Sequence, residues 1–271
     1  MLIHSTLPEK YKSNIDDIYN HYKNNNLSGE GSVHYWINDI ENDQLVRKIN
    51  IIRNAEEIKD EIKKQYPDYS ILSVHESDEV YLSVSPSKRV GSDIGLSDCH
   101  YDAPFKYIYQ GGNVFLRAIL ALNENRTVYT QVEDKTSRLS TGDYNIIRYN
   151  EDYHCVHGSI PENSNRILLK LHFIAVPPNT SDYWIKFCKY INNSWTHYSR
   201  ELMRDSIKPD NLIGFLKQYL VLFGTFVWKY IKIIIFICLL LPILWLNSRF
   251  LIYQKLSKKF KILRKKKRLL P

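Results

Sequence analysis

The segment RILLKLHFIAV, residues 166–176, is the longest of a series of short apolar runs that decide the fold class. It is rich in β-branched and aromatic residues, as β-strands are. Five similar runs precede it: YSILSV (69–74), EVYLSV (79–84), VFLRAILAL (114–122), VYTQVE (128–133) and YNIIRY (144–149). Turn residues separate these runs, and the pattern indicates a compact antiparallel sandwich or barrel of the jelly-roll kind.

The region before these runs has helical periodicity instead. In residues 8–25, apolar and aromatic side chains recur at the spacing of a helix face. Residues 54–66 predict a second helix, with Asn54 as its N-cap, acidic residues in its first turn and Pro67 after its end. We therefore expect an α+β chain in which helices precede the β core.

The composition fits a folded protein in a reducing compartment. Of 271 residues, 44% are hydrophobic and 24% are charged, which is ordinary for a globular chain. The first residues contain no apolar segment typical of a secretory signal. The four cysteines form no CxxC pair: Cys99, Cys155, Cys188 and Cys238. These features favour reduced thiols and a domain on the cytosolic side.

The net charge of +8 comes from the C-terminal end rather than from a basic face. Nine lysines and arginines lie between Lys255 and Arg268, which is more than the whole excess. The rest of the chain is close to neutral, so we expect no binding of DNA or RNA.

Two uncharged apolar runs precede this basic end, at residues 219–228 and 233–246. A window such as 226–246 has the length of a membrane-spanning helix, and tryptophans and tyrosines flank it. A single span, a tight hairpin and a helix lying in the interface all remain open. We expect a bilayer as a partner, with both termini and the folded domain on the cytosolic side.

The motif with the clearest chemistry is SDCHYDAPF, residues 97–105, in which His100 and Asp102 lie two positions apart. Such residues share one face of a strand. With nine histidines in the chain, one such pair is not unusual, so the motif needs partners. Two imidazoles and one carboxylate on one face form the open iron site of non-haem oxygenases. His154 and His157 offer the second imidazole, and Arg166 offers a guanidinium for a dicarboxylate co-substrate.

This order of residues resembles the 2-oxoglutarate- and Fe(II)-dependent dioxygenases over about residues 70–178. The resemblance implies a double-stranded β-helix core, Fe(II) and 2-oxoglutarate as cofactors, and His100 and Asp102 as metal ligands. The run VFLRAILAL is similar to the aspartyl/asparaginyl β-hydroxylase branch, which implies that Arg117 assists 2-oxoglutarate binding. The chain departs from that branch by keeping Asp102.

The distal ligand is His154 or His157. In the resembled family this histidine usually lies ten to thirteen residues after the glycine of the GD turn. His154 lies twelve residues after Gly142, and His157 lies fifteen after it. The sequence around HGS and ENSNR is similar to phytanoyl-CoA dioxygenases and favours His157. We predict His154, with His157 as the alternative, and we expect His172 to fill a strand face.

The expected organisation has five regions: a helical or mixed support (1–68), the double-stranded β-helix core (69–178), a linker or helical part (179–210), a membrane segment (211–253) and a polybasic cytosolic tail (254–271). The expected function is a membrane-anchored Fe(II)/2-oxoglutarate-dependent oxygenase that hydroxylates a lipid, a protein side chain or a small molecule. The alternative is a non-catalytic, membrane-anchored jelly-roll binding module.

Overall fold

The computed structural model describes two compact units, residues 1–218 and 219–271. The residues whose structure is described are 1–24, 32–83, 99, 102, 111–124, 126–149, 151–158, 160, 165–207, 212–217, 219, 220 and 223. All of the helices and strands named below lie in the first unit.

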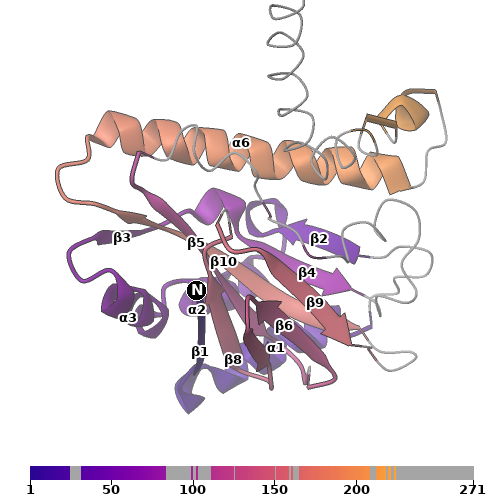
Figure 1. The fold of residues 1–271 in the computed structure, drawn as a ribbon. Helices are drawn as coiled ribbons and strands as arrows, with labels where there is room; N and C mark the ends of the chain where they lie inside the picture. The colour runs from indigo at the N-terminus through magenta and orange to yellow at the C-terminus, as the bar shows by residue number, and fades with distance from the viewer. Residues whose placement is uncertain are drawn as a thin grey trace, which may run out of the picture. The chain divides into compact units, whose positions relative to one another are not determined.

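A large antiparallel sheet forms the centre of this unit (Figure 1). Its order is β1 (Leu2–Thr6), β8 (Asp143–Ile147), β5 (Val114–Ala121), β10 (Arg166–Val176), β4 (Glu79–Ser83) and β2 (Ser32–Trp36). A further strand, β3 (Ser70–Ser73), pairs with the last residues of β10. β10 therefore contacts three strands, and it is buried along its whole length.

A smaller antiparallel sheet lies against the large one and has the order β7 (Lys135–Arg138), β6 (Val128–Val132) and β9 (His154–Gly158). β9 ends at Gly158, which has a φ of +106°. A Cβ atom there would lie 2.0 Å from the carbonyl oxygen of Thr127, so this close approach requires glycine. β9 lies at an edge of this sheet within the part of the chain that is described.

The side chains on the two faces of β10 belong to two different apolar clusters. Its odd-numbered residues, such as Leu169 and Phe173, belong to an apolar cluster with α1 (Lys12–Tyr22), α2 (Asp43–Arg53) and α3 (Glu56–Gln65). Leu168 and Ile174 belong to a second cluster that also contains residues of the small sheet. The three N-terminal helices thus cover one face of the large sheet, and the small sheet covers the other.

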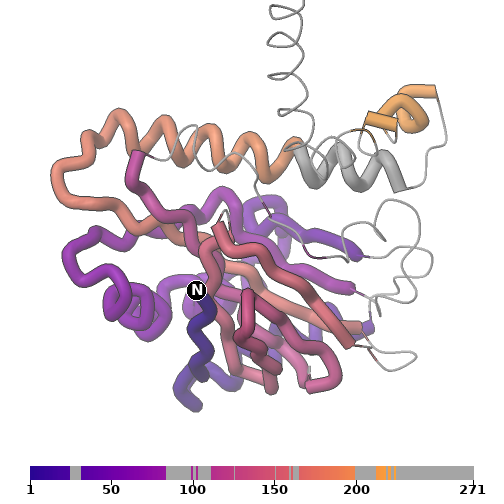
Figure 2. Tube along the Cα trace, viewed as in Figure 1, coloured from indigo at the N-terminus to yellow at the C-terminus, as the bar shows by residue number. Residues whose placement is uncertain are grey.

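A long helix, α6 (Asp182–Ile207), completes the second cluster and crosses one end of the large sheet (Figure 2). Its Cys188 is fully buried. The side chain of Asn192 accepts a hydrogen bond of 2.5 Å from the hydroxyl of Tyr149, just after β8. Lys189 donates a hydrogen bond of 2.9 Å to the carbonyl of Ser73 at the end of β3. These contacts fix α6 beside the end of the sheet where the candidate site lies.

The structure confirms an antiparallel mixed α and β fold, and all six apolar runs contain strands. The region before residue 69 also supplies β1 and β2 to the large sheet, as well as α2. Asn54 as the N-cap of a helix is wrong. Asn54 follows α2 as its C-cap, and Ala55 is the N-cap of α3.

Two of the cysteines are oxidised in the structure, whereas the sequence predicts reduced thiols. Cys99 and Cys155 form a disulfide across 56 residues, whereas Cys188 is free and buried. The expectation is therefore wrong for this pair. It failed because the partner of each cysteine is set by the packing of distant segments, which the spacing of cysteines along the chain does not reveal.

The predicted membrane segment, 211–253, and the basic tail, 254–271, lie largely or wholly outside the described residues. Among the residues that are described, no helix combines the length and the apolar character that a membrane crossing requires.

Candidate metal centre and its buried network

Asp102 and His154 converge from segments that are far apart in the sequence. His154 is the first residue of β9 and is buried. The backbone N–H of Asp102 donates a hydrogen bond of 3.2 Å to the carbonyl of Tyr149, which holds residue 102 beside the start of β9. The Asp102 Oδ2 and His154 Nε2 atoms then lie 3.6 Å apart.

A hydrogen bond at His154 Nδ1 indicates which of the two ring nitrogens carries the proton. Its Nδ1 atom lies 3.2 Å from the backbone carbonyl oxygen of Asp152, which can only accept a hydrogen bond. We therefore assign the proton to Nδ1, and the lone pair of Nε2 is directed toward the Asp102 side. An imidazole that binds a metal through one nitrogen usually donates the N–H of its other nitrogen to a carbonyl or carboxylate, which fixes the orientation of the ring.

These two donors fit a shared metal ion. Two ligand atoms at about 2.1 Å from one ion lie at most about 4.2 Å apart, and the observed 3.6 Å is within this limit. One imidazole and one carboxylate make two of the three ligands of a facial iron site. The third predicted ligand, His100, lies outside the described residues.

His157 lies on the opposite face of β9 from His154. Successive side chains of a strand alternate between its faces, so residues three apart diverge. The His157 ring packs against Tyr129 of β6 with ring centres 5.1 Å apart. The structure thus brings His154, but not His157, to Asp102. The identity of the distal ligand stays a prediction.

Arg117 on β5 contacts the Asp102 carboxylate directly. Its Nη1 donates a hydrogen bond of 2.6 Å to Asp102 Oδ2, and its side chain is 4% exposed. Its Nε donates to His172 Nε2 at 2.9 Å, and the guanidinium lies 4.7 Å from the ring centre of Tyr149. The resemblance implied that Arg117 assists 2-oxoglutarate binding, whereas in the structure it holds the carboxylate of a predicted metal ligand.

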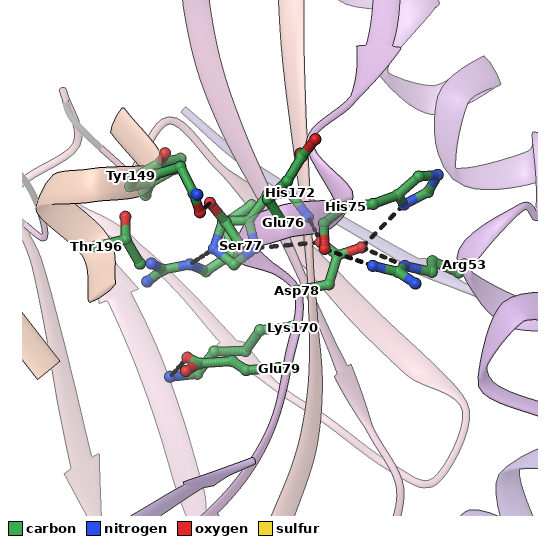
Figure 3. A network of polar contacts seen from close by, with 12 residues as sticks. Arg53, His75, Glu76, Ser77, Asp78, Glu79, Tyr149, Lys170, His172 and Thr196 are labelled. Atoms are coloured by element: carbon green, nitrogen blue, oxygen red, sulfur yellow. Dashed lines mark hydrogen bonds and ion pairs between the residues drawn. The ribbon is translucent and has the colours of Figure 1, made fainter. Parts of the chain in front are cut away.

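A chain of buried polar contacts continues from His172 to the N-terminal helices (Figure 3). His172 Nδ1 and its backbone N–H lie 3.3 and 2.6 Å from Asp78 Oδ1. Asp78 Oδ2 accepts a hydrogen bond of 2.8 Å from Arg53 Nε, and His75 Nδ1 lies 3.2 Å from the same oxygen. The connection from α2 to Asp102 therefore runs through Asp78, His172 and Arg117.

The electrostatics of this chain keep its central histidine neutral. Burial lowers the pKa of His172, and the hydrogen bond with Asp78 offsets this only in part. Burial alone would raise the pKa of Asp78, but the hydrogen bonds from His172 and His75 and the charge of Arg53 lower it to about 2. A neutral His172 that accepts from Arg117 carries its proton on Nδ1 and donates to Asp78.

A second buried ion pair lies on the same sheet face. Lys170 Nζ lies 3.0 Å from Glu79 Oε1, and both side chains are buried (Figure 3). His34 Nδ1 lies 2.8 Å from the other carboxylate oxygen of Glu79. The Lys170 ammonium also lies 3.6 Å from the ring centre of Tyr81, a cation–π distance.

Arg166 begins β10, opposite Ser83 of β4, and is buried. Even-numbered residues of β10 share one face, so Arg166 is on the same side of the sheet as Lys170 and His172. This is the face that the small sheet covers. Its role in binding a dicarboxylate stays a prediction.

Sequence reasoning missed Arg53, Asp78, Glu79 and Lys170. The available signal was the alternation within β10, where charged residues at 166 and 170 and a histidine at 172 share a face in an otherwise apolar strand. Buried charges require partners, so this row indicated charged residues on the neighbouring strands. His172 had been expected only to fill a strand face.

Comparison of structures finds proteins similar to this chain, whereas comparison of sequences does not. No family model matches the chain, and no curated protein matches it. The α-ketoglutarate-dependent epimerase SnoN has a TM-score of 0.44 at 12% identity over 68% of this chain and 83% of its own. HygX from Streptomyces hygroscopicus, solved with nickel and 2-oxoglutarate, has a TM-score of 0.40 at 7% identity over 67% and 84%.

A prolyl 4-hydroxylase from Phytophthora capsici covers 84% of this chain and 90% of its own, with a TM-score of 0.36 at 13% identity. The fold resembles that of 2-oxoglutarate-dependent enzymes. With TM-scores below 0.5, the resemblance assigns no reaction to this chain.

Proposed function

We propose that this protein is an Fe(II)- and 2-oxoglutarate-dependent oxygenase. The observation that carries the proposal is the convergence of the Asp102 carboxylate and the His154 imidazole to 3.6 Å, with His154 buried, Asp102 partly buried and both hydrogen-bonded. This donor pair suits a redox-active iron site with open positions.

The order of strands supports a double-stranded β-helix as the scaffold. Strands β4, β5, β8 and β10 belong to the large sheet, and β6, β7 and β9 belong to the small one. The chain thus passes repeatedly between two facing antiparallel sheets, as in a jelly roll. Residue 102 and the start of β9 lie in the same part of this arrangement.

Each named side chain has a defined task in this proposal. Asp102, His154 and His100 hold the metal, and Arg166 binds the far carboxylate of 2-oxoglutarate with its planar fork. Bound there, iron and 2-oxoglutarate supply the oxidative cleavage of a substrate C–H bond. Arg117 keeps the Asp102 oxygen in place through its 2.6 Å hydrogen bond.

We also propose that the C-terminal segment attaches the enzyme to a bilayer, with the folded domain on the cytosolic side. The support is the uncharged character of residues 219–228 and 233–246 and the basic residues that follow them. A lipid or a side chain of a membrane protein is then the substrate class that the enzyme meets most often, although a small molecule fits the same chemistry.

A non-catalytic binding module is the second candidate function. The observation that favours it is the ion pair between Arg117 and Asp102, because a carboxylate that is already neutralised needs no metal. The two candidates differ in whether Asp102 binds iron.

The deciding experiment measures iron content and succinate release from 2-oxoglutarate by the purified protein under defined Fe(II). Asp102→Ala should lose most bound iron and all turnover, whereas Asp134→Ala, at an exposed turn, should lose neither. Full iron content and turnover in the folded Asp102→Ala variant would favour the binding module.

A further inference from the structure

Three side chains outside the candidate iron site gather on the outer face of the small sheet. The ligand atoms of Cys99, Cys155 and His157 all lie within 4.8 Å of one another. Cys155 is buried, whereas Cys99 and His157 are partly exposed, so an ion can reach the group from solvent.

The alternation of β9 separates this group from the candidate iron site. Cys155 and His157 are two residues apart and share one face, while His154 points to the other. Their partners on β6 are Gln131 and Tyr129, which are also less buried than their neighbours Thr130 and Val132. Cys99 reaches one face of β9 and Asp102 the other.

The sulfur atoms form a disulfide in this structure and in that state offer no thiolate. A dithiol reductant can break the S–S bond by giving two electrons and two protons, and it forms its own disulfide in return. The two thiols then release two protons to solvent when a divalent ion binds them as thiolates.

We propose that Cys99, Cys155 and His157, once the disulfide is reduced, bind a thiophilic divalent ion of the Zn²⁺ type. Two thiolates and one imidazole form a common three-residue zinc set, with a fourth position open to water. Two sulfurs at about 2.3 Å from one ion lie at most about 4.6 Å apart, so after reduction the two side chains must rotate until their sulfurs separate enough to admit the ion. The disulfide and the metal site are alternative states of the same residues.

The preference for a soft ion distinguishes this site from the iron site. Thiolates select zinc and similar ions, whereas the carboxylate and imidazole of Asp102 and His154 suit iron. The inference therefore does not depend on the proposed oxygenase function, and the two can fail separately.

The test uses the full-length protein with Cys188→Ser and Cys238→Ser, so that only the Cys99–Cys155 pair can supply thiolates. Co²⁺ alone is titrated into the reduced and the oxidised protein without oxygen, and absorption from sulfur-to-cobalt charge transfer is recorded. The reduced protein should bind one Co²⁺ with this band, and the oxidised protein should lack it. His157→Ala should weaken Co²⁺ binding at least about tenfold, because it removes a direct ligand.

Asp102→Ala is the control for the iron site and should keep the band at unchanged affinity. Far-ultraviolet circular dichroism establishes that each protein is folded. Cys155→Ser removes one of the two thiolates and should abolish the band, and Cys99→Ser, at a partly exposed position, makes the same test if Cys155→Ser unfolds. The proposal is overturned if the reduced, folded protein shows no band, if His157→Ala binds Co²⁺ as tightly as its parent, or if Asp102→Ala abolishes the band.

Discussion

His154 and Cys155 are neighbours in the chain whose side chains leave β9 on opposite faces. One lies beside Asp102, and the other is bonded to Cys99. A single strand therefore supplies donors of two chemical kinds to two separate places. Residue identity at each position, rather than the presence of histidine in the strand, decides which metal chemistry is possible there.

The two histidines of β9 provide a matched pair of variants. His154→Ala should lose iron and 2-oxoglutarate turnover, because only the remaining donors would hold the metal. His157→Ala should keep iron, because its ring packs on Tyr129 away from Asp102. Iron stoichiometry measured on both variants in parallel tests this. Loss of iron in His157→Ala alone would reverse the ligand assignment, and retention in both would remove the site.

Arg166 offers a test of the co-substrate. Arg166→Lys keeps the positive charge but loses the planar fork, so the concentration of 2-oxoglutarate needed for half-maximal turnover should rise about tenfold or more while iron content is unchanged. Arg138→Lys, on the exposed part of β7, is the matched control and should behave as the parent. An unchanged requirement for 2-oxoglutarate in Arg166→Lys would exclude this role.

At the scale of elements, the pairing of β5 with β10 places Arg117 directly opposite His172. This cross-strand pair joins the candidate metal site to Asp78, which lies between η3 (His75–Ser77) and β4. Because the two strands are central and buried, the register cannot shift without moving every core side chain to the other face. The position of the Asp102 carboxylate is thus set by the pairing of the large sheet.

The buried His172 should make the stability of the protein depend on pH. Its folded-state pKa is below the ordinary value of 6.5, so the unfolded chain binds a proton that the folded one does not. The free energy of unfolding should therefore fall as pH drops below about 6.5, by at most about 1.4 kcal/mol per pH unit. Asp78, with a pKa of about 2, stays ionised in the folded state throughout this window.

Urea denaturation between pH 7 and pH 5 measures this dependence. His172→Gln keeps a polar side chain but cannot titrate, so its slope against pH should be shallower than that of the parent. His21→Gln, at an exposed position on α1, should leave the slope unchanged. Equal slopes for the parent and His172→Gln would show that His172 does not bind its proton differently in the two states.

The strands of the core could be predicted because a strand that is buried on one or both faces appears in the sequence as an apolar or alternating run. Among the described strands, β1 and β2 lie at the edges of the large sheet and have mixed residues that are mostly half-buried, so no such run marks them. Helix α2 did carry a signal, since its buried residues Leu45, Ile49 and Ile52 recur at helical spacing. Edge strands depend on pairing partners that local sequence does not specify.

The candidate site likewise has a part that the sequence predicts and a part that it does not. The donors Asp102 and His154 belong to recognisable motifs, so their convergence could be anticipated from the order of residues. The support from Arg53 through Asp78 to His172 comes from separate elements that meet only in the folded chain. A network of single residues with long sequence separation leaves no periodic pattern, and so sequence alone did not reveal it.

At the scale of the whole molecule, the chain separates into units that differ sharply in charge. Residues 219–271 hold twelve of the 37 lysines and arginines and none of the 29 aspartates and glutamates. Residues 1–218 therefore carry a net charge of −4. The positive charge that the proposed binding to an anionic surface requires is thus confined to residues 219–271.

Deleting residues 219–271 should release the first unit from membranes without unfolding it. The truncated protein should keep the circular dichroism spectrum of the parent and should no longer sediment with vesicles that contain anionic lipid. A variant that keeps 219–271 but replaces the basic residues of 255–268 by glutamine separates charge from apolar insertion. An unfolded or aggregated truncation would show that the tail is needed by the domain.

The central place of β10 has a consequence during synthesis. Strands β4 and β5 both pair with β10, yet β10 is the last of the described strands to leave the ribosome. At translation rates of roughly 5–20 residues per second, the apolar strand β5 waits for roughly 3–11 s before the whole of β10 is made. During this interval the nascent chain presents unpaired strand edges, so we expect its yield on expression to improve with added chaperones that cover such edges until β10 is made.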